Sequence, residues 1–119
     1  MKETEFCRND IVKVSDAAMI LTQTLNKHIT IPELSIIVNL PEKKLKAGFM
    51  QLFGKGVYTY LKSARLLKIK EMLMEDLPLK GIAIETGYKD KSSLIKAFRI
   101  KFGITPGEWK KQQANGPYT

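Results

Sequence analysis

Lysine and arginine are the residues whose number and placement in this chain suggest a chemistry. The sequence has 119 residues, with 20 Lys and Arg against 12 Asp and Glu, and a formal net charge of +8. Residues 1–29 carry equal numbers of basic and acidic side chains, so the whole excess lies in residues 30–119. A basic field of this size attracts polyanions such as DNA, RNA or an anionic membrane surface. A solvated surface without a ligand is the alternative, and charge alone does not decide between the two.

Residues suited to catalysis or metal binding are scarce. Cys7 is the only cysteine and His28 the only histidine, so a disulfide framework, a cysteine zinc site and a Ser-His-Asp triad are excluded. Acidic residues are scattered except for Glu75 and Asp76, which argues against a metal-dependent nuclease. We therefore expect no enzyme activity, no catalytic residue, no cofactor and no metal. A secretory signal and an apolar run of about 20 residues are both missing, so a cytoplasmic protein is expected.

The elements that must position the basic side chains are predicted to be helices throughout. Apolar residues recur at intervals of three and four, and no alternating strand pattern exceeds four residues. About seven helices are expected, including a long one over residues 57–74 and another over residues 91–102. Asn9 or Asp10 is expected to cap the first helix, and Thr30 with Glu33 to form a capping box for the second. Residues predicted to face inward in the first three helices are Ile11, Val14, Ala18, Leu21, Leu25, Ile31, Leu34, Ile37, Val38, Leu45, Phe49 and Leu52.

An internal repeat links these helices to a function. Leu45, Phe49, Phe53 and Gly54 recur 49 positions later as Leu94, Phe98, Phe102 and Gly103, and Ile31, Leu34 and Asn39 recur 48 positions later as Leu79, Ile82 and Gly87. The change of spacing places one extra residue in the second turn. Each copy has a short helix, a turn that needs Asn or Gly, and a longer amphipathic helix. This order is typical of a helix-turn-helix, and two copies with basic charge favour DNA binding over a pair of hairpins without a ligand.

A set of spaced residues carries a family resemblance. The second copy contains Ile82-Ala83, Gly87-Tyr88, Asp90, Ser92, Leu94, Phe98, Phe102-Gly103 and Thr105-Pro106, and the long helix contains Tyr60-Leu61, Arg65-Leu66 and Leu73. In these residues the sequence resembles the DNA-binding domain of the AraC/XylS family of transcriptional regulators, across about residues 10–111. The resemblance implies an all-α fold with two helix-turn-helix lobes joined by a long linker helix, a homeodomain-like tandem. It implies a bacterial transcription regulator that binds specific double-stranded DNA with two recognition helices in successive major-groove segments.

The predicted lobes define the chain's organisation. We expect a linker remnant or disordered N-terminus at residues 1–9 and a first lobe at 10–56. The linker helix then covers 57–76, the second lobe 77–111 and a frayed tail 112–119. Within the linker helix, the 18 residues 57–74 predicted to be helical span about 27 Å, which with packing offsets would hold two reading helices one duplex turn apart. A monomer could then read both segments. The chain is interpreted as the excised C-terminal part of a longer regulator, which could dimerise through a missing upstream domain, rather than as a small stand-alone regulator.

Burial of the apolar faces determines which side chains could face DNA. If Leu45 and Phe49 point inward, the opposite face of their helix presents residues spaced i, i+3, i+4 and i+7. The side chains predicted to face bases are Lys43, Lys46, Ala47 and Met50 in the first lobe and Lys91, Ser92, Ile95, Lys96 and Arg99 in the second. The family resemblance also implies base contacts from all of these except Met50 and Arg99. Lysines could donate to guanine and the apolar side chains could pack on thymine methyls. For each lysine, an ordinary solvated helix face is the alternative.

Other lysines are placed to contact phosphates. Lys44, Lys55, Lys62, Lys89 and Lys101 lie near helix ends or beside the reading helices. Arg65 favours a structural role, and Trp109 is expected to hold the last helix on the second lobe. Gly48 stands where the family has a large apolar residue, and glycine inside a helix costs about 1 kcal/mol relative to alanine.

The expected partners are promoter DNA and RNA polymerase, with no membrane. The alternative is an architectural nucleic-acid-binding protein without sequence preference. Competition with unrelated duplex DNA distinguishes it from a specific regulator, because both bind in a salt-dependent way.

Overall fold

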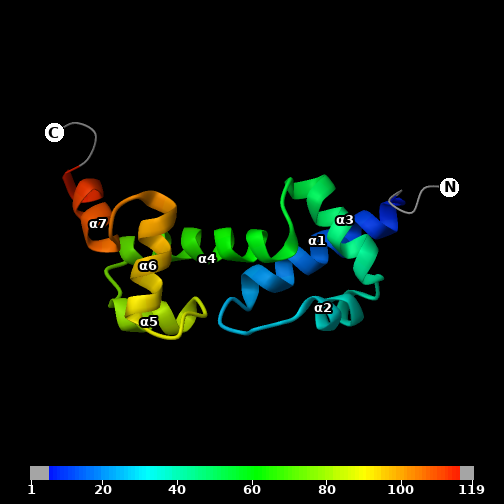
Figure 1. Ribbon diagram of the computed structural model, residues 1–119, viewed down its shortest axis with the longest axis horizontal. Coiled ribbons are helices and arrows are strands. Elements are labelled where there is room, and N and C mark those ends of the chain that lie inside the picture. The colour runs from blue at the N-terminus through cyan, green and yellow to red at the C-terminus, as the bar shows by residue number, and fades with distance from the viewer. Residues whose placement is uncertain (1–5, 116–119) are drawn as a thin grey trace. The chain divides into compact units, whose positions relative to one another are not determined.

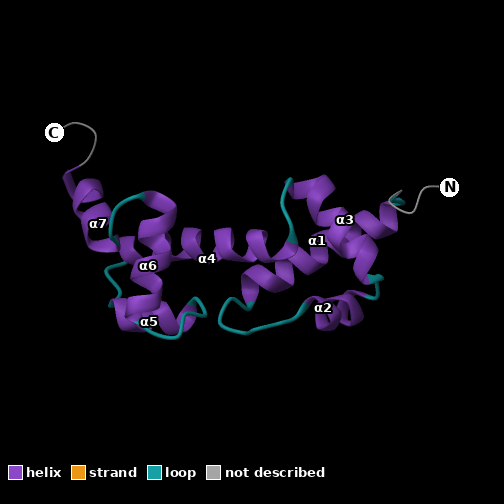
Figure 2. Cartoon of the chain, viewed as in Figure 1, coloured by secondary structure: helices purple, strands orange, loops and turns teal. Residues whose placement is uncertain are grey.

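The computed structural model describes residues 6–115, and this part of the chain contains seven helices and no strand (Figure 2). The helices are α1 (Arg8–Gln23), α2 (Ile31–Val38), α3 (Glu42–Phe53), α4 (Val57–Met74), α5 (Leu79–Glu85), α6 (Lys91–Phe102) and α7 (Pro106–Asn115) (Figure 1). The all-α prediction and the predicted ranges of α4 and α6 are confirmed. Within residues 6–115, no helix has the length and apolarity that crossing a membrane requires.

The chain divides into two compact units, one up to Ala64 and the other from Arg65 onward. In the first unit α1, α2 and α3 pack around Leu34, Leu45 and Phe49, which are fully buried. In the second unit Ile69, Ile82, Leu94 and Phe98 form the corresponding core. Helix α4 supplies buried residues to both cores. Val57 and Leu61 belong to the first core, and the second contains Leu66, Ile69, Met72 and Leu73.

Each unit contains the same helix-turn-helix connection. In the first, the Leu40 amide donates to the Ser35 carbonyl at 3.0 Å, and in the second the Tyr88 amide donates to the Ala83 carbonyl at 2.8 Å. Asn39 and Gly87 occupy the turn with φ values of 55° and 86°, a conformation that Gly and Asn adopt most readily. Helices α3 and α6, the predicted reading helices, begin at Glu42 and Lys91. The extra residue predicted for the second turn therefore lies between Tyr88 and Asp90.

The repeat extends beyond the two-helix motif. Phe49 packs against Phe53 and Tyr60 in the first unit, with ring centroids 5.2 and 5.4 Å away. Phe98 packs in the same way against Phe102 and Trp109 in the second, at 4.6 and 6.2 Å. All three positions are displaced by 49 residues, so the start of α7 occupies the place in the second unit that the start of α4 occupies in the first. The predicted role of Trp109 in holding the last helix on its unit is confirmed.

Side-chain capping defines the starts of α2 and α7. The Glu33 amide donates to Thr30 Oγ1 at 3.2 Å while the Thr30 amide donates to Glu33 Oε1, so the predicted capping box is present. Thr105 and Glu108 form the same reciprocal pair at the start of α7. Asn9 and Asp10 are not the cap of α1, because that helix begins at Arg8 with Cys7 as the capping residue.

Three predicted core residues are wrong. Ile11 is 39%, Ile37 55% and Leu52 41% exposed. Each follows the correct apolar spacing, but each lies at the margin of its helix face, where the neighbouring helix of a small unit no longer covers it. Residues 112–115, predicted as part of a frayed tail, belong to α7. The rest of that tail, 116–119, and residues 1–5 of the predicted N-terminal segment lie outside the described residues.

Candidate nucleic-acid interface

The first reading helix, α3, has one buried and one exposed face. Leu45 and Phe49 are fully buried against α1 and α2. Lys43 and Lys46 are exposed, and Ala47 is half-buried. Met50 is 56% exposed, although a methionine buries well in most cores. The four predicted residues therefore form a continuous strip of two ammonium groups followed by small and flexible apolar side chains.

The second reading helix, α6, presents a more basic strip. Leu94 and Phe98 face the core. The predicted residues Lys91, Ser92, Lys96 and Arg99 are all exposed. Ile95 differs, because it is half-buried and packs partly against the second core. Only part of the Ile95 side chain is therefore available to a ligand.

The two reading helices begin with different chemistry. Asp90 accepts a hydrogen bond from the Ser93 amide at 2.8 Å, and this bond lowers the pKa of the Asp90 carboxyl. Pro41 stands at the equivalent position of α3 and offers no side-chain acceptor. The first turn of α3 therefore lacks the local cap that α6 possesses.

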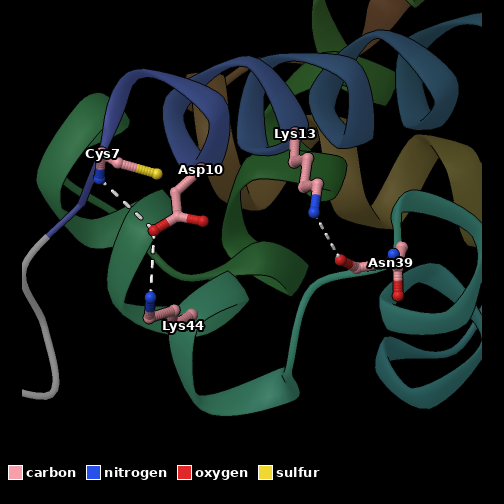
Figure 3. Close-up of polar contacts among 5 residues, drawn as sticks. All are labelled: Cys7, Asp10, Lys13, Asn39 and Lys44. Carbon is pink, nitrogen blue, oxygen red and sulfur yellow. Dashed lines mark hydrogen bonds and ion pairs between the residues drawn. The ribbon is translucent and has the colours of Figure 1, made fainter.

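Lysines predicted to contact phosphate fall into two groups. Lys62, Lys89 and Lys101 are exposed and Lys55 is half-buried. Lys44 is already engaged, since its Nζ lies 3.0 Å from Asp10 Oδ2 on α1 (Figure 3). This ion pair lowers the pKa of the Asp10 carboxyl, chiefly through the hydrogen bond from Lys44.

The sequence did not predict two further lysine contacts, one a hydrogen bond and the other a cation–π contact. Lys13 Nζ on α1 donates to the Asn39 carbonyl at 2.9 Å, directly at the turn that precedes α3 (Figure 3). Lys70 Nζ on α4 lies 3.7 Å from the ring centroid of Phe102 and 5.4 Å from that of Trp109. Both lysines are at helical positions that a sequence assigns to solvent, and only long-range packing reveals their partners.

Arg65 lies beside the second turn. Burial lowers the pKa of its guanidinium, and burial raises the pKa of the nearby Tyr88 hydroxyl while the positive charge of Arg65 opposes that rise. The half-buried position of this arginine supports the structural role favoured from the sequence.

The described part of the chain contains no cluster of metal-binding side chains. No three His, Cys, Asp or Glu residues among 6–115 come together in a group that could hold a metal ion. The candidate interface therefore consists of ammonium and guanidinium donors, hydroxyls and apolar side chains, which suit an anionic polymer with accessible base edges.

Comparisons with known proteins agree with this geometry. The family model described as a helix-turn-helix domain matches residues 34–112. The RCS-specific HTH-type transcriptional activator RclR of Escherichia coli K12 is 32% identical over 84 residues, which cover 70% of this chain and 30% of RclR. The chain spans about a third of the length of the curated relatives it matches.

Solved structures share the fold. The AraC-type DNA-binding domain protein from Chromobacterium violaceum superposes with a TM-score of 0.79 at 20% identity, covering 88% of this chain and 95% of that one. The DNA-binding domain of AdpA, solved in complex with a target DNA, gives 0.77 at 17% identity, covering 90% of this chain and 98% of that one. Since the helix-turn-helix model spans most of the sequence and the curated relatives are transcriptional regulators, the chain belongs to the AraC-type helix-turn-helix family.

Proposed function

We propose that this chain is a sequence-specific, double-stranded DNA-binding domain of a transcription regulator, which places α3 and α6 in successive major-groove segments. One observation carries the proposal. In each unit the turn has the same backbone hydrogen bond, and the helix that follows it buries a Leu and a Phe. The opposite side of that helix exposes a strip of basic side chains. A helix with one face buried in a small rigid unit and the other free is suited to the major groove, which is about 12 Å wide.

Base recognition would come from the exposed strips. Lys46 and Lys96 are the strongest candidates for donation to guanine O6 and N7, since both are exposed near the middle of their helices. Met50 and Ala47 would pack on thymine methyls beside Lys46. Lys43, Lys91, Ser92 and Arg99 would contribute further polar contacts, and Ile95 would offer only its exposed part.

Phosphate contacts would fix the register of the two helices without reading sequence. Lys55, Lys89 and Lys101 are candidates because each lies at or beside the end of a helix, and Lys62 is a candidate because it is exposed in the second turn of α4. Lys44 is set apart, because its ammonium already pairs with Asp10. The curated relatives are about three times longer than this chain, which supports the interpretation that the chain is the DNA-binding domain of a larger regulator. Contact with RNA polymerase, dimerisation and a cytoplasmic location would belong to that whole protein.

Selection of bound duplexes from a random library, in the presence of excess unrelated DNA, tests the proposal. Two short enriched motifs with centres about ten base pairs apart are expected, because adjacent major-groove segments on one face of B-DNA have that spacing. Binding without any enriched motif would instead support the alternative, an architectural protein held by phosphates alone. Absence of binding at about 0.1 M salt would reject both.

A further inference from the structure

The first turn of each reading helix contains a carboxylate contact, but the carboxylate comes from a different place in each unit. In α6 it is Asp90, which precedes the helix and binds the amide of Ser93. Lys44 is the residue of α3 equivalent to Ser93, 49 positions earlier in the repeat. Pro41 cannot cap it, and the carboxylate that reaches Lys44 belongs to Asp10 on α1.

Asp10 is held firmly in place. It is 7% exposed and sits in the first turn of α1, where its Oδ2 also accepts the Cys7 amide at 3.4 Å. The side chain points from α1 toward α3 and meets Lys44 there (Figure 3). A charge-assisted hydrogen bond that a largely buried carboxylate accepts from an ammonium group is stronger and better directed than an exposed surface pair.

A second side chain of α1 contacts the turn that precedes α3. Lys13, one turn after Asp10, donates to the Asn39 carbonyl in the turn before α3. The segment Asn39–Lys44 therefore contacts α1 through a polar side chain at each end, and its Leu40 belongs to the same core cluster as Val14 on α1.

We propose that Asp10 is a positioning residue for the first reading helix, holding Lys44 so that the start of α3 stays fixed against α1. This inference rests on the proposed DNA-reading function. Asp10 holds the first turn of α3 from another helix through the Lys44 side chain, whereas Asp90 caps the first turn of α6 locally through the Ser93 backbone amide. Lys44 then acts as the partner of Asp10 rather than as a phosphate contact.

An alternative role of Asp10, masking the charge of Lys44 from DNA, predicts the opposite change in affinity. If Asp10 instead kept Lys44 away from a phosphate, removing the carboxylate would release Lys44 and strengthen binding. If Asp10 positions α3, removing it weakens recognition by α3 and leaves recognition by α6 unchanged. The sign of the change in affinity separates the two arrangements.

The experiment compares Asp10→Asn with Asp16→Asn in the full chain. Both remove one negative charge from α1, but Asp16 is exposed, whereas Asp10 is largely buried and pairs with Lys44. Affinity is measured for the selected duplex and for duplexes with single substitutions in each motif. The motif read by α3 is identified as the one whose discrimination is lost in Lys46→Ala.

Asp10→Asn should bind the selected duplex about three- to tenfold more weakly than Asp16→Asn, the range expected for one charge-assisted contact. Discrimination should relax only in the α3 motif. Lys44→Met should relax discrimination in the same motif, and the double variant Asp10→Asn with Lys44→Met should relax it no further than either alone, because both changes remove one interaction.

Amide hydrogen exchange of the free protein gives a readout that does not depend on DNA. Exchange of residues 42–46 should increase in Asp10→Asn and not in Asp16→Asn, while exchange over 91–95 stays unchanged. Equal behaviour of the two variants in both measurements, or tighter binding by Asp10→Asn, would overturn the inference. A wild-type protein without any sequence preference would reject the proposed function, and the exchange measurement would still decide the role of Asp10.

Discussion

Gly48 on α3 faces Val14 on α1 at a distance that leaves no room for a side chain. A Cβ at position 48 would lie 2.5 Å from Val14 Cγ2, far inside the contact distance of two carbons. Val14 is fully buried and cannot move aside without disturbing the first core. The close approach of α1 and α3 is therefore built on this glycine, and the cost of a glycine inside a helix is offset by the packing that it permits.

Gly48→Ala should consequently destabilise the protein. Alanine would gain about 1 kcal/mol of helix propensity, but overpacking of a fixed core costs about 1–3 kcal/mol. We expect a net decrease in the free energy of unfolding and in the melting temperature, measured by urea and thermal denaturation.

Gly81→Ala is the matched control, because a Cβ there would meet only Pro78 Cγ at an ordinary 3.8 Å. It should stabilise by about 0.5–1 kcal/mol through helix propensity alone. A stabilising Gly48→Ala would show that α1 and α3 can separate freely.

The fold was predictable because its signals are local. Asn39 and Gly103 end helices with positive φ, and Gly87 takes a positive φ in the turn after α5. The spacing of Leu45 and Phe49 against that of Leu94 and Phe98 revealed the repeat. The margins of the helix faces were less accessible. Ile37 has the right period, and only the size of the neighbouring helices determines that it is left 55% exposed.

The exposure of the candidate base-facing residues was predictable for the same reason. Residues opposite a buried face must be exposed, and Lys46 and Lys96 are. The hydrogen bonds that connect α1 to the start of α3 could not be predicted, because Asp10 and Lys44 are 34 residues apart in the sequence and Lys13 and Asn39 are 26 apart. Each pair involves ordinary surface residue types, and no pattern in the sequence joins them.

Carboxylates at helix starts should make stability depend on acid pH. Hydrogen bonds from the Thr30 and Thr105 amides lower the pKa of Glu33 and Glu108 respectively. Because the folded pKa lies below the unfolded one, each contributes stability that is complete above the ordinary glutamate pKa of about 4.3. That stability is lost as the pH falls through the folded pKa. The free energy of unfolding should therefore decrease with falling pH below about 5.

The double variant Glu33→Gln with Glu108→Gln keeps an acceptor at both capping boxes and removes both titrations. Its free energy of unfolding should vary less between pH 5 and pH 3 than that of the wild type, measured by urea denaturation at each pH. An unchanged acid dependence would assign the effect to other carboxylates.

Lys70 should stabilise the second unit through its cation–π contact with Phe102. Lys70→Met keeps the apolar stem and removes the charge, and a loss of about 0.5–2 kcal/mol is expected. Lys68→Met is the control, because Lys68 makes only an exposed pair with Glu71 at 3.3 Å. Trp109, the only tryptophan, reports unfolding of this unit by fluorescence in both variants. Equal losses would mean that the ring contact adds nothing beyond ordinary surface charge.

Lys96 and Lys55 should affect DNA binding in different ways. Lys96 is exposed on the reading face of α6, whereas Lys55 follows the end of α3. Lys96→Ala should therefore weaken binding to the selected duplex by more than it weakens binding to unrelated duplex, with about 1–3 kcal/mol of discrimination lost at one base pair. Lys55→Ala should weaken both alike and reduce the slope of log affinity against log salt by about one. Titrations of both variants at several salt concentrations, on specific and unrelated duplexes, provide the comparison. If the two variants lose the same amount on both duplexes, Lys96 contacts phosphate, and the base-reading face of α6 must be reassigned to its neighbours.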